Sequence, residues 1–239
     1  MKANKMVQEI IEALEMLSIP EKKAFYPRFF KAGPGEYAEG DLFVGVTVPE
    51  QRKIAKHCFK QIDLEGISEL LKSPYHEHRH LSLLMLVAKY EKGKDEEKLQ
   101  IKSFYLDHLP WINNWDLVDN SCYKILGHHC YETKNDRLLL DLARSENLWS
   151  KRIAVVSTMY YVKRGSFDLL KTIVLINLEH PHDLIHKANG WLLREMGNKN
   201  ETELLNFIDQ HYSKMPRTTL RYAIEKLEEE HRQEILKRK

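Results

Sequence analysis

Apolar residues recur at three- and four-residue steps along nearly the whole chain, which is the spacing of amphipathic helices. Clear stripes of this kind lie in residues 6–17, 81–88, 138–143 and 153–160. Pro20 is expected to stop the first of these helices. The one β-branched run, residues 43–48, ends at Pro49, and residues 33–41 have the composition of a loop. The sequence therefore predicts an all-α protein.

Similar helices recur at a near-constant step when they are aligned where polar residues give way to apolar ones. Their anchors are separated by 37, 36, 35 and 34 residues: Arg79, Asp116, Arg152, Lys187 and Arg221. Each step holds two helices, which is typical of an α-solenoid of HEAT-like antiparallel helix pairs. An irregular helical bundle is the alternative. In a solenoid the second helix of each pair lines the concave side, so residues after each anchor would share one groove.

The composition supports a folded chain without a membrane span. The 239 residues are 43% hydrophobic and 30% charged, and we expect one domain over residues 1–239. No apolar run approaches the roughly 18 residues of a membrane-spanning helix, and the first residues do not have the pattern of a secretory signal. The odd number of cysteines, three, favours reduced thiols over a disulfide framework. We therefore expect a soluble cytoplasmic protein with no membrane partner.

The net charge is near neutral, with 37 basic and 35 acidic residues, and such a total can hide a basic face. Acid-dense segments lie at residues 95–97 and 228–230. Basic residues recur through the second half of the chain, among them Lys151, Arg152, Lys163, Arg164, Lys187, Arg194, Lys199, Lys214, Arg217 and Arg221. This pattern fits a basic binding face, and it also fits a mixed, solvated helix surface.

Three of the expected helices carry aromatic and charged residues at spacings that share a face. The sets are Trp115 with Asp119, Trp149 with Arg152, and Lys187 with Trp191 and Arg194. Each set also has a structural interpretation. Asp116 and Asp119 fit a helix N-cap and its third-position acid, a pairing that stabilises a helix start by about 1 kcal/mol. The tryptophans fit packing between repeats, and Arg152 fits an ion pair with a neighbouring acid.

Other enzyme classes lack their motifs in this chain. There is no Gly-rich phosphate loop, no Cys-x-x-Cys pair and no Gly-x-Ser-x-Gly. The closely spaced His76, His78 and His80 would scatter around a helix axis instead of converging on one metal ion. We expect these histidines to be solvated, and we expect no metal and no cofactor.

With these motifs the chain resembles the AlkD-like DNA alkylation repair glycosylases, which are built from HEAT-like repeats. The resemblance covers roughly Phe25 to Leu227. It rests on four separated motifs in the same order: residues 30–52, Asn114–Asp119, Trp149–Arg152 and Lys187–Glu195. Family members can place a Tyr in the N-terminal helix region, where this chain offers Tyr26, Phe29 and Tyr37.

The resemblance implies a monomeric enzyme with a concave DNA-binding face. It would excise cationic N3- and N7-alkylated purines, such as 3-methyladenine and 7-methylguanine, from double-stranded DNA. By motif match, Asp119 would be the catalytic carboxylate, Trp115 and Trp191 the aromatic walls, and Arg152 the cation beside a phosphate. Further DNA contacts would come from Tyr26, Trp149, Lys151, Lys187 and Arg194.

The chemistry of such a reaction suits these residue types. A cationic purine leaves as a neutral base, so the reaction needs no strong general acid. A fixed carboxylate stabilises the positive charge that develops on the deoxyribose. Indole faces attract a cation, and an arginine holds a phosphate through two hydrogen bonds. The alternative is a non-catalytic helical-repeat module that binds DNA or protein, in which Asp119 only caps a helix.

Overall fold

The computed structural model describes residues 2–238 and confirms the all-α prediction over that range. Residues 2–238 form no β-strand, and the β-type pairing among them is an isolated bridge between Leu42 and Tyr75. None of the helices in these residues combines the length and the apolar composition that a membrane crossing requires. The residues cluster into two compact units that divide between Ser121 and Cys122. The single domain over residues 1–239 stays a prediction.

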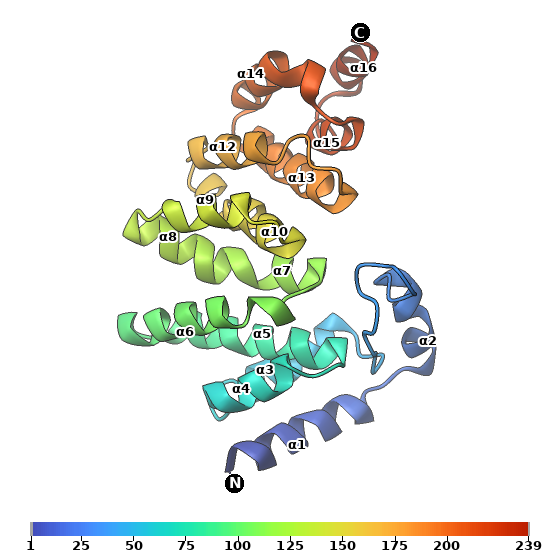
Figure 1. Cartoon of the computed structure of the whole chain (residues 1–239), viewed down its shortest axis with the longest axis vertical. Helices are drawn as coiled ribbons and strands as arrows, with labels where there is room; N and C mark the ends of the chain where they lie inside the picture. The colour runs from blue at the N-terminus through green and yellow to red at the C-terminus, as the bar shows by residue number, and fades with distance from the viewer. Residues whose placement is uncertain (1, 239) are drawn as a thin grey trace. The chain divides into compact units, whose positions relative to one another are not determined.

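In chain order, the helices up to this division are α1 Lys2–Met16, α2 Pro20–Phe29, α3 Val48–Cys58, α4 Leu64–Leu71, α5 His76–Lys92, α6 Asp95–Asp107, the 3-10 turn η1 Leu109–Trp111, and α7 Trp115–Cys122 (Figure 1). Helix α5 packs against α3, α4 and α6 and forms the centre of this unit. Helix α1 ends at Met16, before Pro20. Pro20 instead opens α2, where its missing N–H group leaves no hydrogen bond unmade.

The β-branched run before Pro49 does not form a strand because a buried carboxylate takes the place of a neighbouring strand. Glu77 of α5 accepts hydrogen bonds from the backbone N–H groups of Val44 at 3.0 Å, Gly45 at 2.7 Å and Val46 at 3.2 Å. Gly45 has a φ of +94°, and a Cβ there would lie 2.7 Å from the carbonyl oxygen of Ile19. The segment therefore needs glycine at this position and passes directly over the start of α5.

The second unit contains the π-helix η2 Tyr123–Gly127, α8 His128–Thr133, α9 Arg137–Arg144, α10 Leu148–Ser157, α11 Met159–Val162, α12 Asp168–Ile176, α13 Asp183–Lys199, α14 Glu201–His211, the 3-10 turn η3 Tyr212–Lys214, α15 Arg217–Ala223 and α16 Glu229–Lys237. Helix α13 packs against α10, α12, α14 and α15 (Figure 1). Gly190 allows the close approach of α15, since a Cβ there would lie 2.6 Å from the carbonyl oxygen of Thr219. The predicted stripe over residues 153–160 is divided between α10 and α11.

The five repeat anchors fall in five different helices. Arg79 lies in α5, Asp116 in α7, Arg152 in α10, Lys187 in α13 and Arg221 in α15. Arg79, Asp116 and Lys187 lie in the first part of their helices, whereas Arg152 lies in the middle of α10 and Arg221 in the last turn of α15. The all-α, α-solenoid class is therefore confirmed.

Candidate active-site residues

Helix α7 places Trp115 and Asp119 on one face, as their spacing predicts. The side-chain oxygen of Asn114 accepts the N–H of Trp115 at 2.8 Å, and the carbonyl of Asn114 accepts the N–H of Val118. Asn114 is therefore the residue that begins the helix, and Asp116 lies inside its first turn. Asp119 lies a further turn along, beyond the positions from which a side chain caps a helix start. Both Trp115 and Asp119 are half-buried.

Trp115 belongs to a cluster of aromatic rings from the N-terminal segment. Phe30 stacks on it with ring centroids 5.6 Å apart, and Phe29 meets it edge-on at 5.8 Å. Tyr26 contacts Phe30 and Phe43 edge-on, so this residue lies beside the same cluster. Burial and the negative charges of Glu77 and Asp116 raise the pKa of the Tyr26 hydroxyl. The phenol therefore stays protonated and can donate a hydrogen bond.

The prediction of solvated histidines is wrong for His76, His78 and His80, whose residues are 2%, 4% and 1% exposed. Each has a polar partner outside α5. His78 Nδ1 lies 2.9 Å from the hydroxyl of Ser73, and His80 Nδ1 lies 2.7 Å from the side-chain oxygen of Gln51. Burial lowers the pKa of both His78 and His80 to about 4, so these two imidazoles are neutral near pH 7.

His76 differs from the other two because it lies between two carboxylates. Its Nε2 is 2.8 Å from Oδ2 of Asp116, and its Nδ1 is 3.5 Å from Oδ2 of Asp41. Arg79 donates to the same oxygen of Asp41 at 2.5 Å. Burial lowers the pKa of His76, but the charge of Asp116 and the two hydrogen bonds outweigh it and raise the pKa to about 9. No motif or periodicity in the sequence indicates this buried cluster, because its members lie far apart along the chain.

The predicted residues of α10 are largely enclosed within the second unit. The side chain of Asn147 caps the helix through the N–H groups of Trp149 and Ser150. Trp149 and Arg152 are both buried, and Arg152 donates to the carbonyl of Leu184 at 2.6 Å. The packing interpretation of Trp149 is thus consistent with its burial.

The amine of Lys151 also makes contacts inside the second unit. It lies 3.2 Å from the carbonyl oxygen of Ala143 and 3.3 Å from the side-chain oxygen of Asn177. These hydrogen bonds bind Lys151 to neighbouring segments of its own unit, so the amine is held in place near the start of α10.

Helix α13 carries Lys187, Trp191 and Arg194 at positions i, i+4 and i+7, so the predicted shared face is present. Lys187 pairs with Asp183 one turn earlier at 2.6 Å, and Arg194 pairs with Glu225. Trp191 is half-buried. These cations are therefore compensated by acids of their own unit.

Each unit brings together its own share of the predicted residues. The first holds Tyr26, Trp115 and Asp119, and the second holds Trp149, Lys151, Arg152, Lys187, Trp191 and Arg194. A common groove for both sets stays a prediction. Among residues 2–238, no group of three His, Cys, Asp or Glu side chains is arranged to hold a metal ion.

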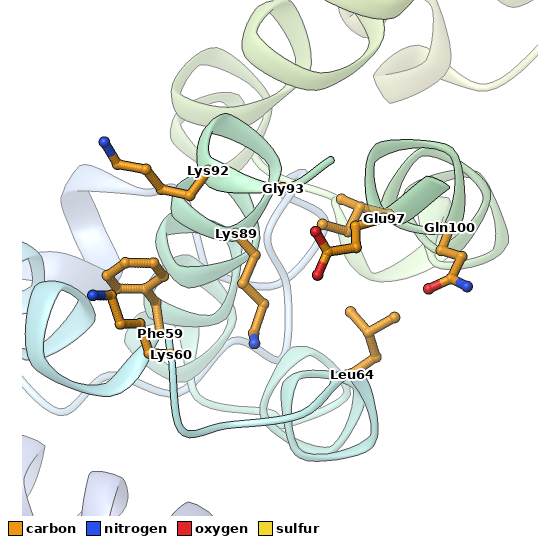
Figure 2. A pocket seen from close by; sticks show the side chains of 9 residues that line it. Phe59, Lys60, Leu64, Lys89, Lys92, Gly93, Glu97 and Gln100 are labelled. Atoms are coloured by element: carbon orange, nitrogen blue, oxygen red, sulfur yellow. The ribbon is translucent and has the colours of Figure 1, made fainter. Parts of the chain in front are cut away.

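A pocket of about 280 Å³ lies in the first unit, away from the predicted residues. It is lined by the residues that follow α3, by α4 and α6, and by the end of α5 (Figure 2). Lys89 and Glu97 extend into it in Figure 2, and burial lowers the pKa of the Lys89 amine. Glu97 also accepts the backbone N–H of Lys94 at the start of α6. None of the predicted site residues lines this pocket.

The described residues form an all-helical fold of the solenoid class, and α7 carries Trp115 and Asp119 on one face. The family profile of DNA alkylation repair enzymes matches residues 10–227, and the chain therefore belongs to this family. Its role is in the repair of alkylated DNA.

A solved structure is similar to this chain in fold. It is the predicted DNA alkylation repair enzyme from Enterococcus faecalis, with a TM-score of 0.67, 18% sequence identity, and coverage of 89% of this chain and 97% of that one. No curated protein matches the chain.

Proposed function

We propose that this chain is a monofunctional DNA glycosylase that hydrolyses the N-glycosidic bond of cationic N3- and N7-alkylated purines in duplex DNA and leaves an abasic site. The observation that carries the proposal is the pairing of Trp115 and Asp119 on one face of α7, in a chain of this family. The enzyme acts as a monomer in the cytoplasm, on chromosomal DNA, and uses neither metal nor cofactor.

Asp119 is the catalytic group. The alkylated purine carries a positive charge, so breaking its bond to the sugar releases a neutral base and leaves the charge on the deoxyribose. The Asp119 carboxylate stabilises this oxocarbenium-like centre and orients the attacking water. Its place within the body of α7 supports this role, because a residue there is not needed to cap the helix.

Trp115 and Trp191 are the aromatic groups of the proposal, and an indole face attracts a cationic base or sugar by about 0.5–2 kcal/mol. Arg152 binds a phosphate beside the lesion and fixes the register of the duplex. The remaining contacts to the DNA come from Tyr26, Trp149, Lys151, Lys187 and Arg194.

The test is the release of free base from DNA that carries 7-methylguanine, measured with enzyme in excess. We expect free 7-methylguanine and an abasic site that alkali converts to a strand break. Retention of the methylated duplex without release of base would instead support the non-catalytic DNA-binding module. No affinity for duplex DNA would favour a protein-binding module.

A further inference from the structure

Four charged side chains form a buried cluster in the first unit: Asp41, His76, Arg79 and Asp116. His76, Arg79 and Asp116 are at most 5% exposed, and the side chain of Asp41 is 6% exposed. The two carboxylates balance one guanidinium and one imidazolium. Uncompensated buried charge is strongly destabilising, so such a cluster persists only when its charges are paired. The protonated form of His76 completes that balance.

The cluster touches α7 at the turn that begins the candidate site. Asp116 lies directly after Trp115 and three residues before Asp119. One oxygen of Asp116 contacts His76 at 2.8 Å, and the other accepts the N–H of Leu117 at 2.8 Å. The first turn of α7 is therefore in direct contact with a side chain of α5.

The ring of His76 supports the same site from a second direction. Phe30 lies against it with centroids 4.3 Å apart, and Phe43 stacks on it at 5.4 Å. Phe30 also stacks on Trp115, with ring planes inclined by 24°. One imidazole thus contacts the helix of Asp119 through its Nε2 and contacts Phe30, the ring that stacks on the indole of Trp115.

His78 and His80 supply the comparison within the same helix, because both are buried imidazoles with one polar partner. Their partners, Ser73 and Gln51, lie outside α7. Of the three buried histidines of α5, His76 is therefore the one whose hydrogen-bond partner lies in α7.

We propose that His76 is a positioning residue that holds Trp115 and Asp119 of α7 in the orientation in which they act on the alkylated nucleotide. This inference rests on the proposed function. A displacement of about 1 Å in an active site costs about a hundredfold in rate, so loss of this contact should reduce the chemical step far more than binding.

The first experiment compares His76→Gln with His78→Gln in single-turnover excision of 7-methylguanine, well below the Tm of each variant. We expect His76→Gln to lower the rate at saturating enzyme by about tenfold or more while the Kd for undamaged duplex changes less than about twofold. His78→Gln removes an equally buried imidazole from the same helix and should keep the rate within about twofold. Asp116→Asn retains the size of the side chain and should reproduce the loss in His76→Gln.

Equal rate losses in the His76 and His78 variants, or a full rate in folded His76→Gln and Asp116→Asn, would overturn the positioning role. Hydrogen exchange of the backbone amides of residues 115–121 tests the role without activity. These amides should exchange faster in His76→Gln and Asp116→Asn than in the wild type, and at the wild-type rate in His78→Gln. If the wild type releases no base, the proposed function fails, but the exchange experiment still decides whether His76 positions α7. Unchanged exchange in all three variants would refute the positioning role of His76.

Discussion

At the scale of single residues, removing the charge of Asp119 should affect the rate of excision and the affinity for DNA differently. Asp119→Asn keeps the shape of a half-buried side chain but removes the charge that, in the proposed mechanism, faces the developing oxocarbenium. We expect the single-turnover rate of 7-methylguanine excision to fall by at least about a hundredfold, with Tm and duplex affinity nearly unchanged. The exposed Asp141, paired with Arg137 one turn earlier, provides the control Asp141→Asn. A wild-type rate from Asp119→Asn would remove this residue from the active site.

Arg152 has both a structural contact and a proposed DNA contact, and two substitutions distinguish them. Arg152→Ala loses the hydrogen bond to the carbonyl of Leu184, so Tm should fall along with binding and excision. Arg152→Lys keeps the charge but loses the planar fork, and should recover binding better than rate. Melting curves and single-turnover rates measure the two effects. Unchanged activity per folded molecule in Arg152→Ala would leave only the structural role.

Gly45 is the residue whose backbone conformation the fold most clearly requires. At its φ of +94°, Gly45→Ala strains the backbone and drives a Cβ to 2.7 Å from the carbonyl of Ile19. Gly35 also has a positive φ, +75°, but has open space around it. Strain alone should cost Gly35→Ala about 1–2 kcal/mol in the free energy of unfolding, and Gly45→Ala should lose clearly more. Denaturant unfolding measures both, and equal losses would show that the contact with Ile19 has no consequence.

At the scale of elements, the contact between α5 and α7 makes stability depend on pH. The pKa of His76 is raised from 6.5 to about 9 in the folded protein. Because the pKa is higher in the folded protein, protonated His76 adds to the free energy of unfolding. This contribution is fully present below about pH 6.5 and is lost as the pH rises through 9. The shift corresponds to at most about 3 kcal/mol.

The measurement is the free energy of unfolding of the wild type and of His76→Gln between pH 6 and pH 10. The difference between the two proteins should shrink as the pH rises from 6.5 to 9, because the wild type loses the contribution that the variant never has. A difference that stays constant across this range would show that His76 carries no charge in the folded protein.

At the scale of the whole molecule, binding to duplex DNA should depend on salt. Phosphate contacts release counterions, so log affinity falls with log salt by about 0.9 for each phosphate neutralised. We expect a slope of several units, and Lys187→Ala should lower it by about one. Lys187 is paired with Asp183, so the control Asp183→Asn should leave the slope or increase it. Affinity independent of salt would contradict a DNA-binding face.

The helices and the composition of each candidate face followed from the sequence alone because both are local properties. A repeat of three and four residues defines a helix wherever it occurs, and a spacing of four places Trp115 and Asp119 together on it. The five anchors fall in five helices for the same reason. The resemblance of the motifs to one family is likewise a property of residue order.

Only the tertiary structure decided which polar residues are buried. His76 is enclosed because Asp41 and Asp116, 35 and 40 residues away in the chain, supply the carboxylates that compensate it. The run that ends before Pro49 stays irregular because the carboxylate of Glu77, more than 30 residues later, accepts hydrogen bonds from its backbone N–H groups. Burial of a charge or an amide depends on partners that folding brings from elsewhere, and periodicity along the chain carries no information about them.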